Sequence, residues 1–272
     1  MPLESLLLAH ETALRLAAFV AVFAAMAAWE TLAPRRALEL SRRERWPANL
    51  GVVILNTLLV RVLLPTAAVG MALAAQTHGW GLLNHFALPA WAALAAGIAF
   101  LDLAIYLQHV LFHAIPLLWR LHRMHHADLE FDVTTGARFH PIEIVVSMLI
   151  KMAVVVGLGA PPIAVFLFEI VLNATAMFNH SNVGLSPRLD RGLRWLVVTP
   201  DMHRVHHSIE THETNSNFGF NLPWWDRLFG TYRDQPARGH DGMTIGLPVL
   251  RDPSEQRLDR MLTQPFRNAD PT

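Results

Sequence analysis

The chain has 272 residues, of which 53% are hydrophobic and only 16% are charged, and its 22 Lys and Arg balance its 22 Asp and Glu. A soluble domain usually carries about 25% charged residues, so this composition favours one membrane-embedded domain, and zero net charge argues against nucleic acid as a partner. The absence of cysteine excludes disulfides, thiolate chemistry and iron–sulfur ligation.

Three apolar runs predict membrane helices in the N-terminal part of the chain. The first, about 13–29, is long enough to cross a bilayer. The second, about 50–75, leads to a loop at 76–85 that lacks Lys and Arg and should face outward. The third, about 88–107, crosses the membrane in the opposite direction. The positive-inside rule places the arginine cluster after the first run in the cytoplasm, so the third run also ends there. The cluster consists of Arg35, Arg36, Arg42, Arg43 and Arg45.

A later apolar segment, about 142–178, is broken by Gly157, Gly159 and the pair Pro161-Pro162. Proline stops a helix and favours a reversal, so the segment predicts a helical hairpin that enters from the cytoplasm and returns. Each arm of about 17 residues is marginal for a full crossing, which leaves a shallow re-entrant pair as the alternative. The predicted fold is all-α: a multi-pass membrane helical bundle with about four transmembrane helices, or three plus a re-entrant hairpin, and a cytoplasmic histidine-rich cap.

Three histidine boxes dominate the sequence. The pattern His-x-x-His-His occurs at 122–126 and at 203–207, each time with Arg second, and a His-x-x-x-His pair precedes them. Residues at i, i+3 and i+4 of a helix are neighbours, so the three imidazoles of each box should point at one place. Clustered neutral imidazoles typically bind a transition metal, although a solvated histidine-rich helix face is the alternative. Eight ligands exceed the roughly four to six of one ion, which predicts two metals. The predicted ligands are His109, His113, His122, His125, His126, His203, His206 and His207.

Other polar residues are candidates for the same centre. His180 ends the hairpin and is predicted as a ninth ligand, whereas His140 is either a ligand or part of a rigid entry turn. Asp102 lies two helical turns before His109 and can either hold a ligating histidine or make a helix-packing hydrogen bond. Glu169 has the same two interpretations, because ionisable groups in membrane helices are usually functional or paired.

The remaining histidines and two arginines receive simpler interpretations. Arg123 and Arg204 cannot bind a metal, so we expect them to pair with acids or lipid head groups. Five histidines outside the boxes are predicted to be surface residues: His10, His78, His85, His212 and His240.

The order of the boxes resembles the fatty acid hydroxylase/sterol desaturase superfamily of integral-membrane di-iron enzymes. Shorter motifs add to this resemblance and are located at 138–141 (Arg-x-His-Pro), 179–182 (Asn-His-Ser-Asn), 199–200 (Thr-Pro), 217–219 (Asn-Phe-Gly) and 225–232 (Trp-Asp-Arg-Leu-Phe-Gly-Thr-Tyr). The resemblance covers about residues 98–233, which we therefore predict to be a catalytic domain. The flanking parts are then an N-terminal transmembrane region at 1–97 and a polar C-terminal tail at 234–272.

The resemblance implies an O₂-dependent enzyme with two iron ions that hydroxylates or desaturates a C–H bond of a lipid, such as a fatty acyl chain or a sterol. The lipid would enter from the bilayer, and electrons would come from NAD(P)H. Because no haem or flavin fingerprint is visible, the carrier should be a separate electron-transfer protein. Zinc can replace iron in purified protein, because Zn²⁺ binds nitrogen sites more tightly than Fe²⁺.

The expected location is the bacterial inner membrane, with the boxes on the cytoplasmic face. A carotenoid hydroxylase or an ether-lipid monooxygenase would have the same chemistry. A non-catalytic metal-binding membrane protein, such as a transporter, is a different alternative. Coupling sites of transporters usually lie near mid-bilayer, whereas these boxes are predicted at the membrane edge.

Overall fold

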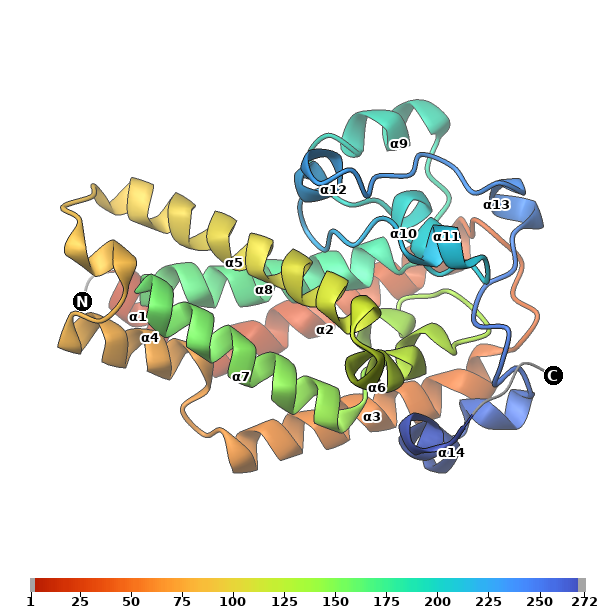
Figure 1. The fold of residues 1–272 in the computed structure, drawn as a ribbon, viewed down its shortest axis with the longest axis horizontal. Coiled ribbons are helices and arrows are strands. Elements are labelled where there is room, and N and C mark those ends of the chain that lie inside the picture. Colours follow the sequence, from red (N-terminus) through yellow and green to blue (C-terminus); the bar gives the residue numbers. More distant parts are fainter. Residues whose placement is uncertain (1–2, 269–272) are drawn as a thin grey trace.

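The computed structural model describes residues 3–268, and in this range the chain is helical, with two isolated β-bridges in place of any sheet. Figure 1 shows long helices running side by side along the long axis of the molecule, with most of the short helices gathered at one end. The all-α prediction is confirmed. We call the end with the short helices the cap.

Apolar helices, most of them at least 18 residues long, form the bundle. They are α2 (Glu11–Leu32), α3 (Arg42–Leu63), α4 (Ala67–His78), α5 (Ala90–Ala114), α7 (Pro141–Leu158) and α8 (Pro162–Asn179), and the short α1 (Leu3–Ala9) precedes them. Five segments are long and apolar enough to cross a membrane, with α3, α4 and the adjoining η1 (Leu82–His85) counted as one. The predicted single run at 50–75 is thus two helices, because Pro65 lies between them and cannot continue the helical hydrogen bonds.

The hairpin of α7 and α8 turns where the glycine and proline residues predicted it. Gly159 ends α7 with a φ of 67°, and Pro162 is the first residue of α8. A Cβ atom on Gly81 would lie 2.1 Å from the backbone nitrogen of Gly159, so the hairpin turn touches the connection between α4 and α5. Each arm of 18 residues extends about 27 Å, close to the roughly 30 Å hydrocarbon thickness. The contact of the hairpin turn with the connection between α4 and α5 favours a full membrane crossing by α7 and α8 over a shallow re-entrant pair.

The apolar core lies between α4, α5, α7 and α8, away from the cap. Small side chains on α4, such as Ala68 and Ala72, are fully buried, and they allow neighbouring helices to approach closely. Large apolar side chains cover the outside of the bundle, including Phe100 and Leu107 of α5. An apolar core and an apolar exterior together are what a membrane bundle requires.

Short helices joined by hydrogen-bonded loops form most of the cap. They are α6 (Pro116–His126), η2 (Thr135–Ala137), α9 (Pro187–Leu193), α10 (Pro200–His206), α11 (Thr211–Thr214), α12 (Trp224–Leu228), α13 (Gly239–Gly242), η3 (Pro253–Gln256), α14 (Leu258–Thr263) and η4 (Gln264–Phe266). Helix α10, which carries most of the second box, starts with a Thr199 side chain that accepts from the Met202 amide, followed by Pro200 at the first position. Both are strong helix-start signals.

The predicted polar tail folds back onto the cap. Arg123 of α6 donates to the carbonyls of Gln264 and Arg267. Gln256 accepts from Arg138 at 2.5 Å and donates to the Ala127 carbonyl at 3.1 Å. The described part of the tail therefore packs against the first histidine box. The domain boundaries at 97 and 233 stay predictions.

Candidate metal centre

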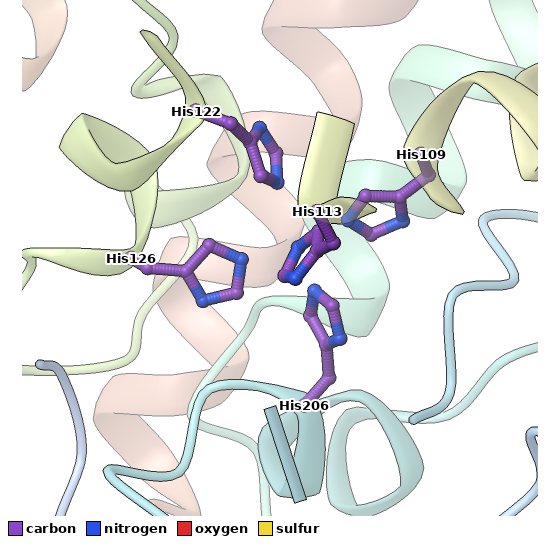
Figure 2. Close-up of side chains that lie close together, drawn as sticks. All are labelled: His109, His113, His122, His126 and His206. Atoms are coloured by element: carbon purple, nitrogen blue, oxygen red, sulfur yellow. The ribbon is translucent and has the colours of Figure 1, made fainter. Parts of the chain in front are cut away.

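All nine predicted histidine ligands lie together in the cap, in two groups. Figure 2 shows the five rings of the first group converging from α5, α6 and α10. Within each group, one nitrogen of every ring lies within 4.8 Å of the others. The first group contains His109, His113, His122, His126 and His206, and the second contains His125, His180, His203 and His207.

The two groups are adjacent and share both boxes. His126 of the first group stacks on His207 of the second with ring centroids 4.5 Å apart. The first box sends its i and i+4 residues to the five-histidine group and its i+3 residue, His125, to the other. The second box does the reverse, with His206 alone in the five-histidine group. The prediction that each box points at one place is therefore wrong: residues i+3 and i+4 differ by about 100° around a helix, so they face neighbouring sites.

A bend in the chain brings the first two boxes together. Helix α5 ends at Ala114, because Pro116 cannot continue it and instead begins α6. His109 and His113 lie one helical turn apart at the end of α5. The ring of His113 consequently lies 5.0 Å from that of His122 and 4.8 Å from that of His126, measured between centroids.

Backbone carbonyls set the tautomer of several rings. Nδ1 of His109 donates to the Phe218 carbonyl at 2.8 Å. Nδ1 of His206 donates to the Ser216 carbonyl at 2.7 Å, and Nδ1 of His180 donates to the Ala176 carbonyl at 2.8 Å. A carbonyl can only accept, so these Nδ1 atoms carry the proton and each Nε2 keeps a lone pair. The Nε2 atoms of His109 and His206 are buried without a partner. A ring held in this way is ready to ligate a metal.

The four-histidine group contains nitrogen atoms that face one another. Nε2 of His180 lies 3.2 Å from Nε2 of His125 and 3.1 Å from Nε2 of His203. Its own lone pair points at them, because its proton is on Nδ1. Burial lowers the pKa of both His180 and His206 to about 3, so these rings are neutral near pH 7. Converging buried ring nitrogens fit a shared cation.

Glu143 is a partner of the centre that sequence reasoning missed. Its carboxylate accepts from Nδ1 of His122 at 2.6 Å, and the side chain is buried in the first turn of α7. The rule that singled out Asp102 and Glu169, an acid inside an apolar segment, would also have found it. Asn215 makes a similar but longer contact, 3.3 Å, with Nδ1 of His113.

Three uncertain candidates lie away from the rings. Asp102 accepts from Nε1 of Trp225 in α12 at 2.8 Å and from the Leu222 amide in the loop before it, so its described hydrogen bonds are not to a histidine. Glu169 pairs with Lys151 at 3.0 Å and with Arg15 at 2.9 Å, inside the bundle. His140 belongs to neither group and caps the start of α7. Metal ligation by the nine histidines stays a prediction.

The expectations for the other histidines and for two arginines have mixed outcomes. His10, His78, His85 and His212 are exposed, as predicted. His240 is only 6% exposed, so that prediction is wrong: the folded tail places it 3.7 Å from Asp201. Arg204 pairs with Asp201 as expected, whereas the described hydrogen bonds of Arg123 are to carbonyls.

A buried ion network supports the loop after the first box. Arg45, predicted in a cytoplasmic charge cluster, is fully buried and binds Asp128 at 2.7 Å and Asp132 at 2.6 Å. Burial alone would raise the pKa of Asp128, but Arg45 and Arg138 outweigh it and hold that pKa at about 2. Asp128 follows His126 by two residues, so the network ties the first box to α3.

Comparison with known proteins identifies related sequences. Residues 94–231 match the fatty acid hydroxylase family. The ornithine lipid hydroxylase OlsE of Rhizobium tropici is 32% identical over 67% of this chain and 54% of its own length. The alkylglycerol monooxygenases of Xenopus tropicalis and Homo sapiens are 28% and 27% identical, over 64% and 53% of this chain and 39% and 31% of theirs. The chain thus spans about half or less of these relatives. No solved structure matches.

Proposed function

Because the chain belongs to the fatty acid hydroxylase family, we propose that it is a membrane-bound di-iron oxygenase that hydroxylates a C–H bond of a lipid. The observation that carries this proposal is the pair of adjacent groups with five and four histidines. Each group would hold one iron ion, because imidazoles suit ferrous iron and nine ligands match two sites. When bound, the iron supplies the redox chemistry that activates O₂. All nine ligands lie within 98–233, which we propose as the catalytic domain.

The protein side chains orient the rings and exclude water. Backbone carbonyls and Glu143 fix which nitrogen of a ring carries the proton. Eight of the nine histidines are buried. Water exclusion directs a strong oxidant to the bound substrate and limits side reactions.

We place the approach of the lipid at His113, the one partly exposed ring of the nine. It lies near the end of α5, and the junction of α5 with α6 exposes the apolar side chains of Leu111, Ile115 and Leu117. The Trp119 ring lies 4.8 Å from the His113 ring, measured between centroids. An alkyl chain moving laterally from the bilayer would meet this junction first, so we assign the substrate to a chain-bearing lipid.

The substrate class also has support in the names of the relatives, which refer to an ornithine lipid and to alkylglycerols. An ether-lipid monooxygenase is therefore the second candidate. Hydroxylation of the carbon attached to an ether oxygen gives a hemiacetal, which breaks into an aldehyde and an alcohol. We further propose electrons from NAD(P)H through a separate carrier protein and a cytoplasmic position of the cap in a bacterial inner membrane.

Isotope labelling tests the reaction. Iron-loaded protein is incubated with ¹⁸O₂, a reductant and either an acyl lipid or an alkylglycerol, and the products are analysed by mass spectrometry. We expect one ¹⁸O atom in a hydroxylated acyl lipid, with the second oxygen atom reduced to water. Aldehyde release from the alkylglycerol alone would select the second candidate. Desaturation consumes O₂ without labelling the lipid. Label from H₂¹⁸O in the hydroxyl group of an acyl lipid would indicate a metal-activated water as the nucleophile and would contradict the oxygenase proposal.

The control for this experiment is a His206→Ala variant, because His206 belongs to the five-histidine group. It should bind less iron and form no labelled product. Bound metal in the parent protein without lipid-dependent O₂ consumption would instead support a non-catalytic metal-binding protein.

A further inference from the structure

An exposed apolar surface lies on the cap, outside the five candidate spans. Six large side chains at α9 and α12, which we call the α9–α12 patch, are 50–69% exposed: Leu189, Trp195, Leu196, Trp224, Leu228 and Phe229. Figure 1 shows α9 and α12 next to one another, projecting to one side of the long helices near α5. Contiguous apolar surface of this kind usually marks a contact with a partner or a membrane.

The patch is held together by specific contacts. Trp224 donates its indole N–H to the Trp195 carbonyl at 2.6 Å. The Arg227 guanidinium lies 4.1 Å from the Trp195 ring centroid and 3.9 Å from that of Tyr232. Tryptophan and arginine with apolar bodies and polar tips are typical of the membrane–water interface.

Helix α5 provides a measure of the depth of the patch. Phe229 stacks on Tyr106 with ring centroids 5.4 Å apart, and Trp225 bonds to Asp102. At the other end of α5, Trp91 is 73% exposed, and Trp80 in the connection that precedes α5 is exposed as well. Exposed tryptophans are typical of a membrane interface, so we take this end of α5 as the opposite one. Tyr106 follows Trp91 by a helical distance of about 22 Å, which is shorter than the roughly 30 Å hydrocarbon thickness. A protein segment packed on Tyr106 therefore reaches the depth of the lipid chains.

The loop that leads to α12 has the hydrogen bonding that this depth requires. Non-helical backbone is tolerated there only where its polar groups find protein partners. The amides of Phe218 and Gly219 both donate to Asp226 at 2.8 Å, and the Leu222 amide donates to Asp102 at 3.3 Å. These bonds favour the packing interpretation of Asp102 over a hydrogen bond to a ligating histidine.

We propose that the α9–α12 patch is inserted into the interfacial layer of the bilayer that the chain itself spans. Its occupant is phospholipid, at the boundary between head groups and acyl chains. Phe229 of the patch packs on α5, and the same helix exposes Phe100, Leu107 and Leu111 on its outer side. The inference depends on the membrane location of the chain and not on the reaction that it catalyses.

Depth-dependent quenching tests the proposal. The chain has no cysteine, so Leu228→Cys and Leu189→Cys each give one site for an environment-sensitive fluorophore. Both side chains are exposed, so these substitutions leave no cavity. In phosphatidylcholine vesicles, we expect a nitroxide on the upper acyl chain to quench both labels, while aqueous iodide leaves their emission unchanged. Leu107→Cys on α5 serves as the lipid-facing control and Thr211→Cys on α11 as the water-facing control.

The outcomes separate the alternative occupants. Iodide quenching of both patch labels as strong as that of the Thr211 label would overturn the proposal, and it is also the outcome expected for a docking site of a soluble carrier protein absent from the vesicles. Protection of the patch labels from iodide that grows with protein concentration in detergent would indicate that a second copy of the chain covers the patch. This result would equally refute insertion of the patch into the bilayer. The two patch positions lie on different helices, so a folding defect in one variant leaves the other informative.

Discussion

At the scale of single residues, Glu143 provides a test of whether a partner of a candidate ligand affects metal binding. Its carboxylate holds Nδ1 of His122 at 2.6 Å. Such partners commonly change metal affinity by about 10- to 100-fold. We therefore expect Glu143→Ala to weaken metal binding by about that factor in a chelator competition assay. Glu143→Gln keeps an acceptor oxygen, so its metal affinity should lie between those of the parent protein and of Glu143→Ala.

The matched control is Asp259→Asn, because Asp259 is exposed on α14 and pairs only with Arg257 among its described ion pairs. Equal metal affinity in Glu143→Ala and in this control would show that His122 does not need its carboxylate partner.

His180 and His140 provide a second test. Both were candidate metal ligands from the sequence, but only His180 lies in a histidine group in the structure. His180 lies in the four-histidine group, whereas His140 caps α7 and contacts the Leu262 carbonyl. Elemental analysis of the parent should give about two metals per chain, given nine shared imidazoles. His180→Ala should lose about one of them, and His140→Ala should keep both. Full metal content and full activity in His180→Ala would remove it from the ligand set.

At the scale of elements, the C-terminal helices hold α6 in place. The Gln256 side chain joins η3 to both Arg138 and the Ala127 carbonyl. Removing it leaves a buried guanidinium and a carbonyl without this partner, which costs about 1–3 kcal/mol. Gln256→Ala should therefore lower the melting temperature in detergent, and the exposed neighbour variant Ser254→Ala should not. Identical melting of the two variants would mean that the tail does not secure the cap.

At the scale of the whole molecule, the orientation of the cap can be measured directly. The positive-inside rule predicts that the cap faces the cytoplasm. Single cysteines at the exposed positions Ser41 and Thr211 should then be protected from a membrane-impermeant thiol reagent in intact cells, and one at Thr77 should react. Reaction at Thr211 together with protection at Thr77 would reverse the orientation and place the histidines outside.

Local patterns in the sequence were sufficient for the helices and for the histidines that cluster in the structure. Apolar runs and the breaks at Gly159 and Pro161 depend on neighbouring residues and on bilayer thickness, so they can be read without a structure. The five-and-four division of the histidines, the pairing of His122 with Glu143, the contact of Asp102 with Trp225 and the burial of His240 were decided by tertiary structure. These contacts join residues 21 to about 120 positions apart, and helix packing, which no local period encodes, determines which of them meet.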